Sequence, residues 1–356
     1  MAPSTPCREL VIHAGTHKTA TSYIQSRLAA NTPVLARPGV TVRYPAAGAL
    51  KFKPLAAALA RGDWDIWRHY LAGLPTGATT VLMSAEQFTQ PLARPDRHKP
   101  LLELLAEAGF RLQVVVFLRD QPDYINARFV HSTRRLYHHQ SFEAYVAEQL
   151  GPLRRAIYDY SHLFTPLLDR AEGSDDLRCQ FLPYGSGLGD PFERLMASQG
   201  WEPPAQGWRP ADPQRGNVQP GCGGVWLAQA ISVRLEALGV DPAALPNTGG
   251  VVRQIAERQG WTEDRYCGFD ADSAARVAEH FAATNDAFAH RVWGCPWRER
   301  VPAVSMQRRQ FTPPAGPEAS RRLERLVDRA VAMLARQNPS LAQLLAAVSP
   351  NTMVPS

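Results

Sequence analysis

Short apolar runs alternate, along the first half of the chain, with stretches in which apolar positions recur every three or four residues. The strongest run, Arg111–Leu118 (RLQVVVFL), becomes continuously apolar, which is typical of a strand buried on both faces. Four shorter runs predict further strands, at Glu9–His13, Val40–Tyr44, Thr79–Met83 and Leu177–Leu182. Helices are expected at Ala20–Asn31, twice within Pro54–Leu74, and at Leu101–Ala108, Pro122–Leu136, Tyr158–Ala171 and Phe192–Gln199. This alternation predicts an α/β fold, with a parallel sheet flanked by helices in three layers.

The second half of the chain has a helical pattern. Helices are expected at Val225–Leu238, Val251–Gln259, Ala274–Phe288 and, after a basic and proline-rich stretch, Arg321–Leu334. We therefore expect a main domain over residues 1–298 and a C-terminal part over residues 299–356, made of a linker and an amphipathic helix. That helix could close on its own chain, pair with a second chain or lie on an anionic surface, and plain packing is the simplest of the three.

The net charge of +6 is unevenly distributed, with eight Lys/Arg and four Asp/Glu in residues 299–356. Residues 1–298 therefore carry a net charge of only +2. Nucleic-acid-binding proteins have a dense basic face, so this charge does not indicate one. Five cysteines without a C-x-x-C pair argue against a zinc site or a disulfide framework, and favour free thiols. The first ten residues do not form a secretory signal, and no apolar run is long enough to cross a membrane, so we expect a cytoplasmic protein.

The segment HAGTHKTATSYIQ, residues 13–25, joins the first expected strand to the first expected helix. Backbone N–H groups at a helix start favour an anion, and Lys18 adds a positive charge. Hydroxyl donors follow at Thr19, Thr21 and Ser22. ATPases place the lysine of their phosphate loop beside a second glycine, whereas Lys18 comes only three residues after Gly15. The segment thus reads as a phosphate loop of another kind, or as an ordinary helix start with solvated side chains.

HAGTHKTATSYIQSRLAAN resembles the 5′-phosphosulfate loop of sulfotransferases that use 3′-phosphoadenosine 5′-phosphosulfate (PAPS), particularly the bacterial carbohydrate-type members. Ala20 stands where the family usually has Gly. The resemblance implies a P-loop NTPase-like sulfotransferase fold and a PAPS-dependent enzyme. It assigns donor binding to Gly15, Thr16, His17, Lys18, Thr19, Ala20, Thr21 and Ser22.

Two later segments resemble the same family in the same order. The segment at residues 79–88 (TTVLMSAEQF) contains Glu86, and VVVFLRDQPDYINARF at residues 114–129 contains Arg119. The resemblance implies that Arg119 binds the 3′-phosphate, and the alternative is a salt bridge to Asp120 or Asp123. Eight residues after Arg119, where the family usually has Ser, this chain has Ala127.

Sulfuryl transfer requires an acceptor oxygen or nitrogen in line with the sulfur and the leaving phosphate. We expect Lys18 to stabilise the leaving phosphate and Glu86 to act as general base, with His13 and His17 as rival bases; no metal is needed. The acceptor is expected to be a small molecule or glycan with a hydroxyl or amine. A nucleotide kinase or NTPase of related fold and a non-catalytic PAP-binding protein remain the alternatives.

Overall fold

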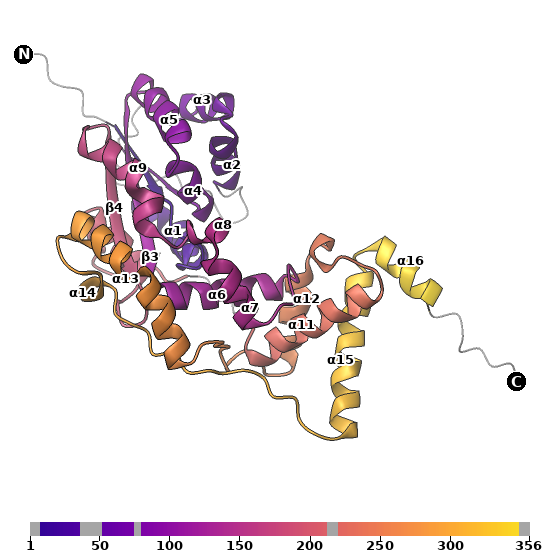
Figure 1. The fold of residues 1–356 in the computed structure, drawn as a ribbon. Helices are drawn as coiled ribbons and strands as arrows, with labels where there is room; N and C mark the ends of the chain where they lie inside the picture. The colour runs from indigo at the N-terminus through magenta and orange to yellow at the C-terminus, as the bar shows by residue number, and fades with distance from the viewer. Residues whose placement is uncertain (1–7, 36–51, 75–79, 212–219, 349–356) are drawn as a thin grey trace, which may run out of the picture. The chain divides into compact units, whose positions relative to one another are not determined.

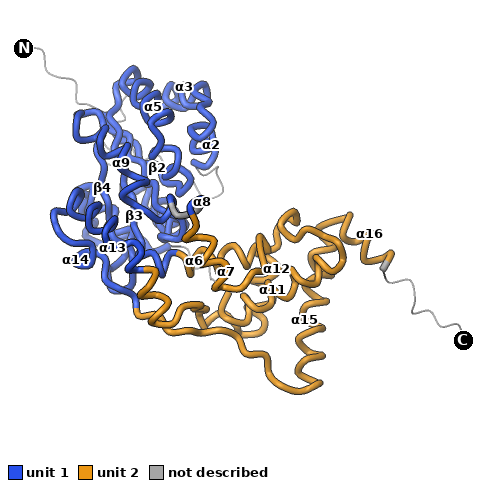
Figure 2. The backbone as a smooth tube through the Cα atoms, viewed as in Figure 1, with its two compact units in different colours: residues 1–124, 152–217, 278–304 blue, residues 125–151, 218–277, 305–356 orange. Residues whose placement is uncertain are grey.

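The computed structural model describes residues 8–35, 52–74, 80–211 and 220–348 (Figure 1). The strand expected at Val40–Tyr44 lies outside these residues. The chain divides into two compact units (Figure 2). Unit 1 comprises residues 1–124, 152–217 and 278–304, and unit 2 comprises residues 125–151, 218–277 and 305–356. The units do not follow the boundary expected near residue 298, and the assignment of domains stays a prediction.

Unit 1 contains a four-stranded sheet in which every strand is parallel to its neighbours. The strands are β1 (Arg8–His13), β2 (Thr80–Ser84), β3 (Phe110–Arg119) and β4 (Leu177–Tyr184). Their order is β2-β1-β3-β4, so β1 and β3 are central and β4 forms one edge. The continuous apolar run in β3 is buried along nearly its whole length, as expected for a central strand covered on both faces. The α/β class and the parallel sheet are confirmed.

Helices of unit 1 cover both faces of the sheet. Right-handed crossovers place the helix after β1 on one face and those leading to β3 and β4 on the other. In agreement, α1 packs against α10, and α5 packs against α9. The elements of unit 1 are α1 (Thr21–Leu35), α2 (Lys53–Arg61), α3 (Trp64–Ala72), η1 (Glu86–Phe88), α4 (Thr89–Leu92), α5 (Pro95–Glu107), α8 (Pro152–Arg155), α9 (Tyr160–Glu172), α10 (Pro191–Ser198) and α14 (Trp297–Arg300). Two longer helices, α6 (Gln121–Arg134) and α13 (Ala271–Trp293), contribute residues to both units.

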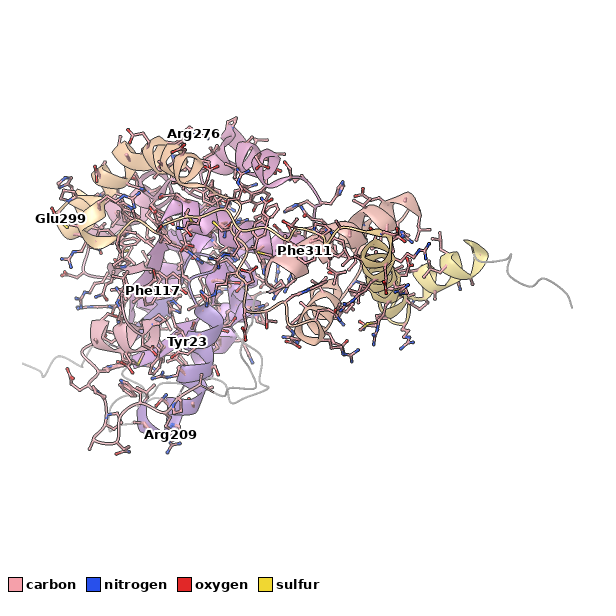
Figure 3. The ribbon with its side chains drawn as sticks, turned by 90° about the horizontal axis from the view of Figure 1, so that it is seen from below. Tyr23, Phe117, Arg209, Arg276, Glu299 and Phe311 are labelled. Atoms are coloured by element: carbon pink, nitrogen blue, oxygen red, sulfur yellow. The ribbon has the colours of Figure 1, made fainter. Side chains whose placement is uncertain are left out.

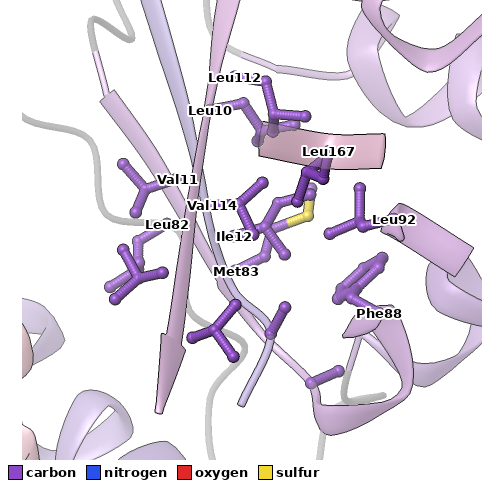
Figure 4. Close-up of a cluster of buried hydrophobic side chains, with 14 of the residues drawn as sticks. Leu10, Val11, Ile12, Leu82, Met83, Phe88, Leu92, Leu112, Val114 and Leu167 are labelled. Carbon is purple, nitrogen blue, oxygen red and sulfur yellow. The ribbon is translucent and has the colours of Figure 1, made fainter. Parts of the chain in front are cut away.

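The main core lies between the sheet and its helices. In Figure 4, Leu167 of α9 lies with Phe88 and Leu92 on one side of the strands, while Val11 and Leu82 point to the other. All five side chains are at most 1% exposed. Burial on both faces accounts for the uninterrupted apolar pattern that identified these strands in the sequence.

Unit 2 is helical, and its core is separate. Its remaining elements are α7 (Phe142–Leu150), α11 (Cys222–Ala237), η3 (Pro242–Ala244), α12 (Thr248–Arg258), α15 (Pro317–Ala335) and α16 (Pro339–Val348). The amphipathic helix expected from the sequence is α15, which buries its apolar face against α11 and α12. Packing within the chain, the simplest of the three alternatives, is therefore confirmed. The sequence pattern did not identify α7 or α16.

Two further expectations concern the chain as a whole. No helix in the described part is long and apolar enough to cross a membrane. Four of the five cysteines are described, and all four are free thiols: Cys179, Cys222, Cys267 and Cys295.

The contribution of the core can be tested with the same substitution at a buried and an exposed leucine. Leu167 is fully buried, whereas Leu153 is 95% exposed. We expect Leu167→Ala to lower the free energy of unfolding by about 2–5 kcal/mol, because it removes buried methyl groups and leaves a cavity. Leu153→Ala should change it by less than about 0.5 kcal/mol. Urea unfolding followed by circular dichroism measures both, and equal effects would contradict the packing described.

Candidate functional site

The candidate site lies at the carboxyl edge of the sheet in unit 1. Because the strands are parallel, the loops that follow them leave from the same edge. The chain runs from β1 to β2 on one side, and from β3 to β4 on the other. The strand order thus reverses between β1 and β3, and open α/β sheets bind ligands at such a switch point. The segment from Gly15 to Ala20 and residue Arg119 lie at this position.

Hydrogen bonds hold the start of the loop after β1. The backbone N–H of Ala14 donates to the carbonyl oxygen of Val115 (2.9 Å). The N–H and Oγ1 of Thr16 both donate to the carbonyl oxygen of Phe117 (3.3 and 3.0 Å). From α4, Thr89 Oγ1 donates to the carbonyl oxygens of Ala14 and Gly15. Thr16, expected to bind the donor, therefore anchors the loop to β3 through its side chain.

Gly15 lies at a crowded point of the loop. A Cβ at this position would lie 2.7 Å from Thr19 Oγ1, 3.1 Å from His13 Nε2 and 3.3 Å from Thr21 Oγ1. Any larger residue would therefore displace these side chains. His13 Nε2 and Thr21 Oγ1 are buried and have no hydrogen-bond partner within the described chain. Buried polar atoms of this kind require an explanation, and water, a bound ion and a catalytic role are among the usual ones.

His13 is held in its neutral form. Its Nδ1 lies 2.8 Å from Ser84 Oγ at the end of β2, and its ring meets the ring of Phe117 edge to face at 5.5 Å. Complete burial lowers the pKa of His13 to about 3, although the carboxylate of Glu86 opposes this shift. A group with so low a pKa is a weak base near neutral pH. These contacts favour a packing role for His13 and weigh against its role as general base.

The backbone reverses sharply before α1. Lys18 and Ala20 both have positive φ angles, of 69° and 59°. The helix begins at Thr21, so the expectation that Ala20 opens it is wrong. The reason is that Ala20 adopts a left-handed conformation, which glycine occupies with less strain and which the family's usual Gly would favour.

The three hydroxyls of the loop differ in their surroundings. Thr19 Oγ1 is buried and donates to the carbonyl oxygen of Thr16 at 2.5 Å. Thr21 Oγ1 lies beside Gly15, and Ser22 is exposed. The N–H groups of the first three residues of α1 have no acceptor within the helix, whereas that of Ile24 donates to the carbonyl oxygen of Ala20 (2.9 Å). Thr21, Ser22 and these N–H groups are thus the donors best placed to hold an anion.

Glu86 lies beside this loop. It is the first residue of η1, which follows β2 almost directly. Its Oε1 lies 3.3 Å from His17 Nδ1, and both side chains are partly exposed. The sequence thus correctly placed Glu86 at the sheet edge that carries the loop of Lys18.

Arg119 ends β3 and contacts the same loop. Its Nη1 donates to the carbonyl oxygen of Lys18 (2.7 Å), while its Nε and Nη2 donate to the two carboxylate oxygens of Asp123 (2.5 and 2.7 Å). Tyr160 Oη donates to the carbonyl oxygen of Arg119 (2.6 Å). Burial alone would lower the pKa of Arg119, and Asp123 more than offsets it, so the pKa is raised. The salt bridge considered from the sequence is therefore present with Asp123, and 3′-phosphate binding stays a prediction.

Asp120, the other acid considered as a partner of Arg119, pairs instead with Arg298 at 2.9 Å. Burial raises the pKa of Asp120, and the Arg298 guanidinium opposes that shift. Asp120 therefore does not compete for Arg119.

Ala127 is buried on α6, in unit 2. The amide of the neighbouring Asn126 donates to the carbonyl oxygen of Tyr266 and accepts from the N–H of Gly268 (3.1 and 3.0 Å). Ser132 Oγ donates to the carbonyl oxygen of Arg128 (2.8 Å). Asn126 and Ser132 are thus both hydrogen-bonded within unit 2. Either would have to break these bonds to supply the hydrogen-bond donor that a serine at position 127 would provide.

Several contacts that shape the site were not identified from the sequence. Thr89 holds the loop from α4, and Gln25 of α1 donates through Nε2 to the carbonyl oxygen of Ser84 (2.8 Å). Neither belongs to a motif, so only the folded chain reveals them. Among the described residues, no three His, Cys, Asp or Glu side chains are grouped to hold a metal ion.

No family model, no curated protein and no solved structure matches this chain. The geometry of the site and the motif of its loop are therefore the features of this chain that bear on function.

The strain at Ala20 can be tested by substitution. Ala20→Gly should raise the free energy of unfolding by about 0.5–1 kcal/mol, because the cost of a left-handed Cβ exceeds the added entropy of glycine in the unfolded chain. Ala29→Gly within α1 is the matched control and should lower it by about 1 kcal/mol. Chemical denaturation measures both, and destabilisation by Ala20→Gly would contradict the backbone described.

Proposed function

We propose that this chain is a PAPS-dependent sulfotransferase with a P-loop NTPase-like sulfotransferase fold. One observation carries the proposal: a phosphate-loop-like segment lies at the switch point of a parallel sheet, with Glu86 and Arg119 both contacting it. The match of Lys18, Thr19, Thr21 and Ser22 to the family's loop supports the same conclusion.

The donor's 5′-phosphosulfate would bind at the loop between β1 and α1. The unpartnered Thr21 Oγ1, together with the N–H groups at the start of α1, would donate to its oxygens. Lys18 would stabilise the negative charge that develops on the phosphate oxygen as the bond from sulfur to that oxygen breaks. Because the loop is already held by β3 and α4, little reorganisation would accompany binding.

Glu86 would act as the general base. In its ionised form it would accept the proton of the acceptor hydroxyl or amine while the acceptor atom forms its bond to sulfur in line with the leaving phosphate. The products would be a sulfated acceptor and PAP. His17, 3.3 Å from the Glu86 carboxylate, would orient that carboxylate.

Arg119 would bind the 3′-phosphate only with donors beyond those already engaged by Asp123 and the Lys18 carbonyl. Asp123 would then act as a positioning residue for the guanidinium. We propose that the acceptor is a small molecule or a glycan. We also propose that the protein is cytoplasmic and that transfer needs no metal ion.

The donor can be tested by calorimetry with PAP in the absence of magnesium. We expect one PAP site in the wild-type chain. Lys18→Ala should lower the rate of sulfuryl transfer by about 10²–10³-fold, because it removes one donor that stabilises the developing charge. Release of PAP from PAPS, with a panel of monosaccharide, disaccharide and amino-sugar acceptors, measures the rate. Lys99→Ala, at an exposed lysine of α5, is the matched control and should behave as wild type.

Other results would favour the alternatives. Magnesium-dependent binding of ATP in place of PAP would indicate a kinase or NTPase. Binding of PAP without transfer to any acceptor of the panel would indicate a non-catalytic PAP-binding protein. Normal turnover by Lys18→Ala would refute the role given to the lysine.

The base is tested separately. Glu86→Gln should lower turnover by about 10²–10⁴-fold, the usual contribution of a positioned base, while PAP affinity stays unchanged. Glu103→Gln, at an exposed glutamate of α5, removes the same charge and should have no effect. The pH dependence of the rate provides a second readout, because the acidic limb that reports ionisation of the base should disappear in Glu86→Gln. A limb that persists unchanged would assign the base to another group.

A further inference from the structure

A second feature of unit 1 lies along the outer edge of β4. A cavity of about 780 Å³ opens there, which we call the β4 groove. It is bordered by α9, the C-terminal end of α13, α14 and α10. Five arginines but only two carboxylates line it, and these charged residues are Arg111, Arg178, Arg194, Arg291, Arg300, Glu172 and Asp175.

Arg194, on α10, is the most buried of these arginines. Its Nη1 donates to the carbonyl oxygen of Pro183 (2.5 Å), and its guanidinium carbon lies 5.8 Å from the ring centre of Phe117, which is labelled in Figure 3. Burial lowers the pKa of Arg194, and no carboxylate opposes that shift. Within the described chain Arg194 forms no ion pair, so this partly buried guanidinium has no counter-charge from the protein.

The other arginines divide into two kinds. Arg291 is neutralised, since it contacts Asp169 at 2.6 Å and Glu172 at 2.7 Å. Arg111, Arg178 and Arg300 are exposed, and none of them forms an ion pair with a described residue. Of the two carboxylates that line the groove, Glu172 is therefore paired with Arg291, and Asp175 remains. The arginines outnumber the carboxylates, so the groove presents an excess of positive charge to a ligand.

The edge of β4 is poorly suited to adding a peptide strand. Phe181 and Pro183 direct their carbonyl groups outward, and both carbonyls are occupied, by Trp293 Nε1 (3.0 Å) and by Arg194. Pro183 also has no N–H to donate. Strand addition needs a continuous row of free donors and acceptors, so we exclude an extended peptide as the occupant of this groove.

We propose that the β4 groove binds a ring-bearing organic polyanion, a sugar that carries sulfate or phosphate esters, with Arg194 as the anchoring cation. The cavity has the size of sites that hold small organic ligands. Arginine binds such oxyanions through paired hydrogen bonds, and Trp293 supplies apolar ring surface beside them. This inference does not rest on the proposed function, because no residue of the groove belongs to the loop of Lys18.

Calorimetry with sucrose octasulfate at low ionic strength tests the proposal, with sucrose as the neutral control. We expect the sulfated sugar to bind and sucrose not to bind. Arg194→Gln should weaken binding by about 10- to 100-fold, the effect of losing one charged hydrogen bond or two. Arg178→Gln should also weaken binding of the sulfated sugar. This second variant tests the proposal if Arg194→Gln does not fold. Arg68→Gln, at an exposed arginine of α3 outside the groove, should bind as wild type.

Glucose 6-sulfate and glucose 6-phosphate then distinguish the two esters by their relative affinities. Lys18→Ala should bind sucrose octasulfate as tightly as wild type, which separates this site from the proposed donor site. The proposal is overturned if sucrose octasulfate does not bind the wild-type chain. Affinities of Arg194→Gln and Arg178→Gln equal to that of Arg68→Gln would overturn it as well.

Discussion

The candidate site depends on how the loop after β1 is held against β3. The carbonyl oxygen of Phe117 accepts both hydrogen bonds from Thr16, and the Arg119 guanidinium reaches from the end of β3 to the carbonyl oxygen of Lys18. These bonds cross the point at which the strand order reverses. Together with the bonds from Thr89 to the start of the loop, they fix the segment that carries Lys18 relative to the strands.

That tethering accompanies local strain. Lys18 and Ala20 both occupy left-handed backbone conformations, and each costs about 1–2 kcal/mol for a residue with a Cβ. The crowding of Thr19, His13 and Thr21 around Gly15 excludes any side chain there. Strain of this kind persists only where surrounding contacts determine the conformation, and it is concentrated at functional sites. The orphaned Thr21 hydroxyl and His13 nitrogen belong to the same few residues, so strain and unsatisfied polarity coincide.

Periodicity in the sequence was sufficient to predict the sheet, because buried parallel strands are apolar on both faces and therefore stand out. The position of residues 15–20 between a strand and a helix, and the position of Glu86, were also readable, since both follow strand ends directly. The sequence could not reveal the left-handed backbone of Ala20, because an alanine before a helix is ordinarily taken into it. Thr89 and Gln25 belong to no motif, so their contacts with the site could not be predicted. The salt bridge of Arg119 to Asp123 was one of two alternatives, and the sequence alone could not decide between it and phosphate binding.

The division of the chain into two compact units has a consequence for any attempt to separate them. Each unit is assembled from three stretches of sequence that alternate along the chain, so the polypeptide passes from one unit to the other repeatedly. Cleavage of the chain at any single crossing would still leave the two units covalently connected, because the chain crosses between them at other points. Neither unit corresponds to a contiguous fragment that could be cloned by itself, and a boundary sought by serial truncation from either terminus would remove parts of both before it isolated one.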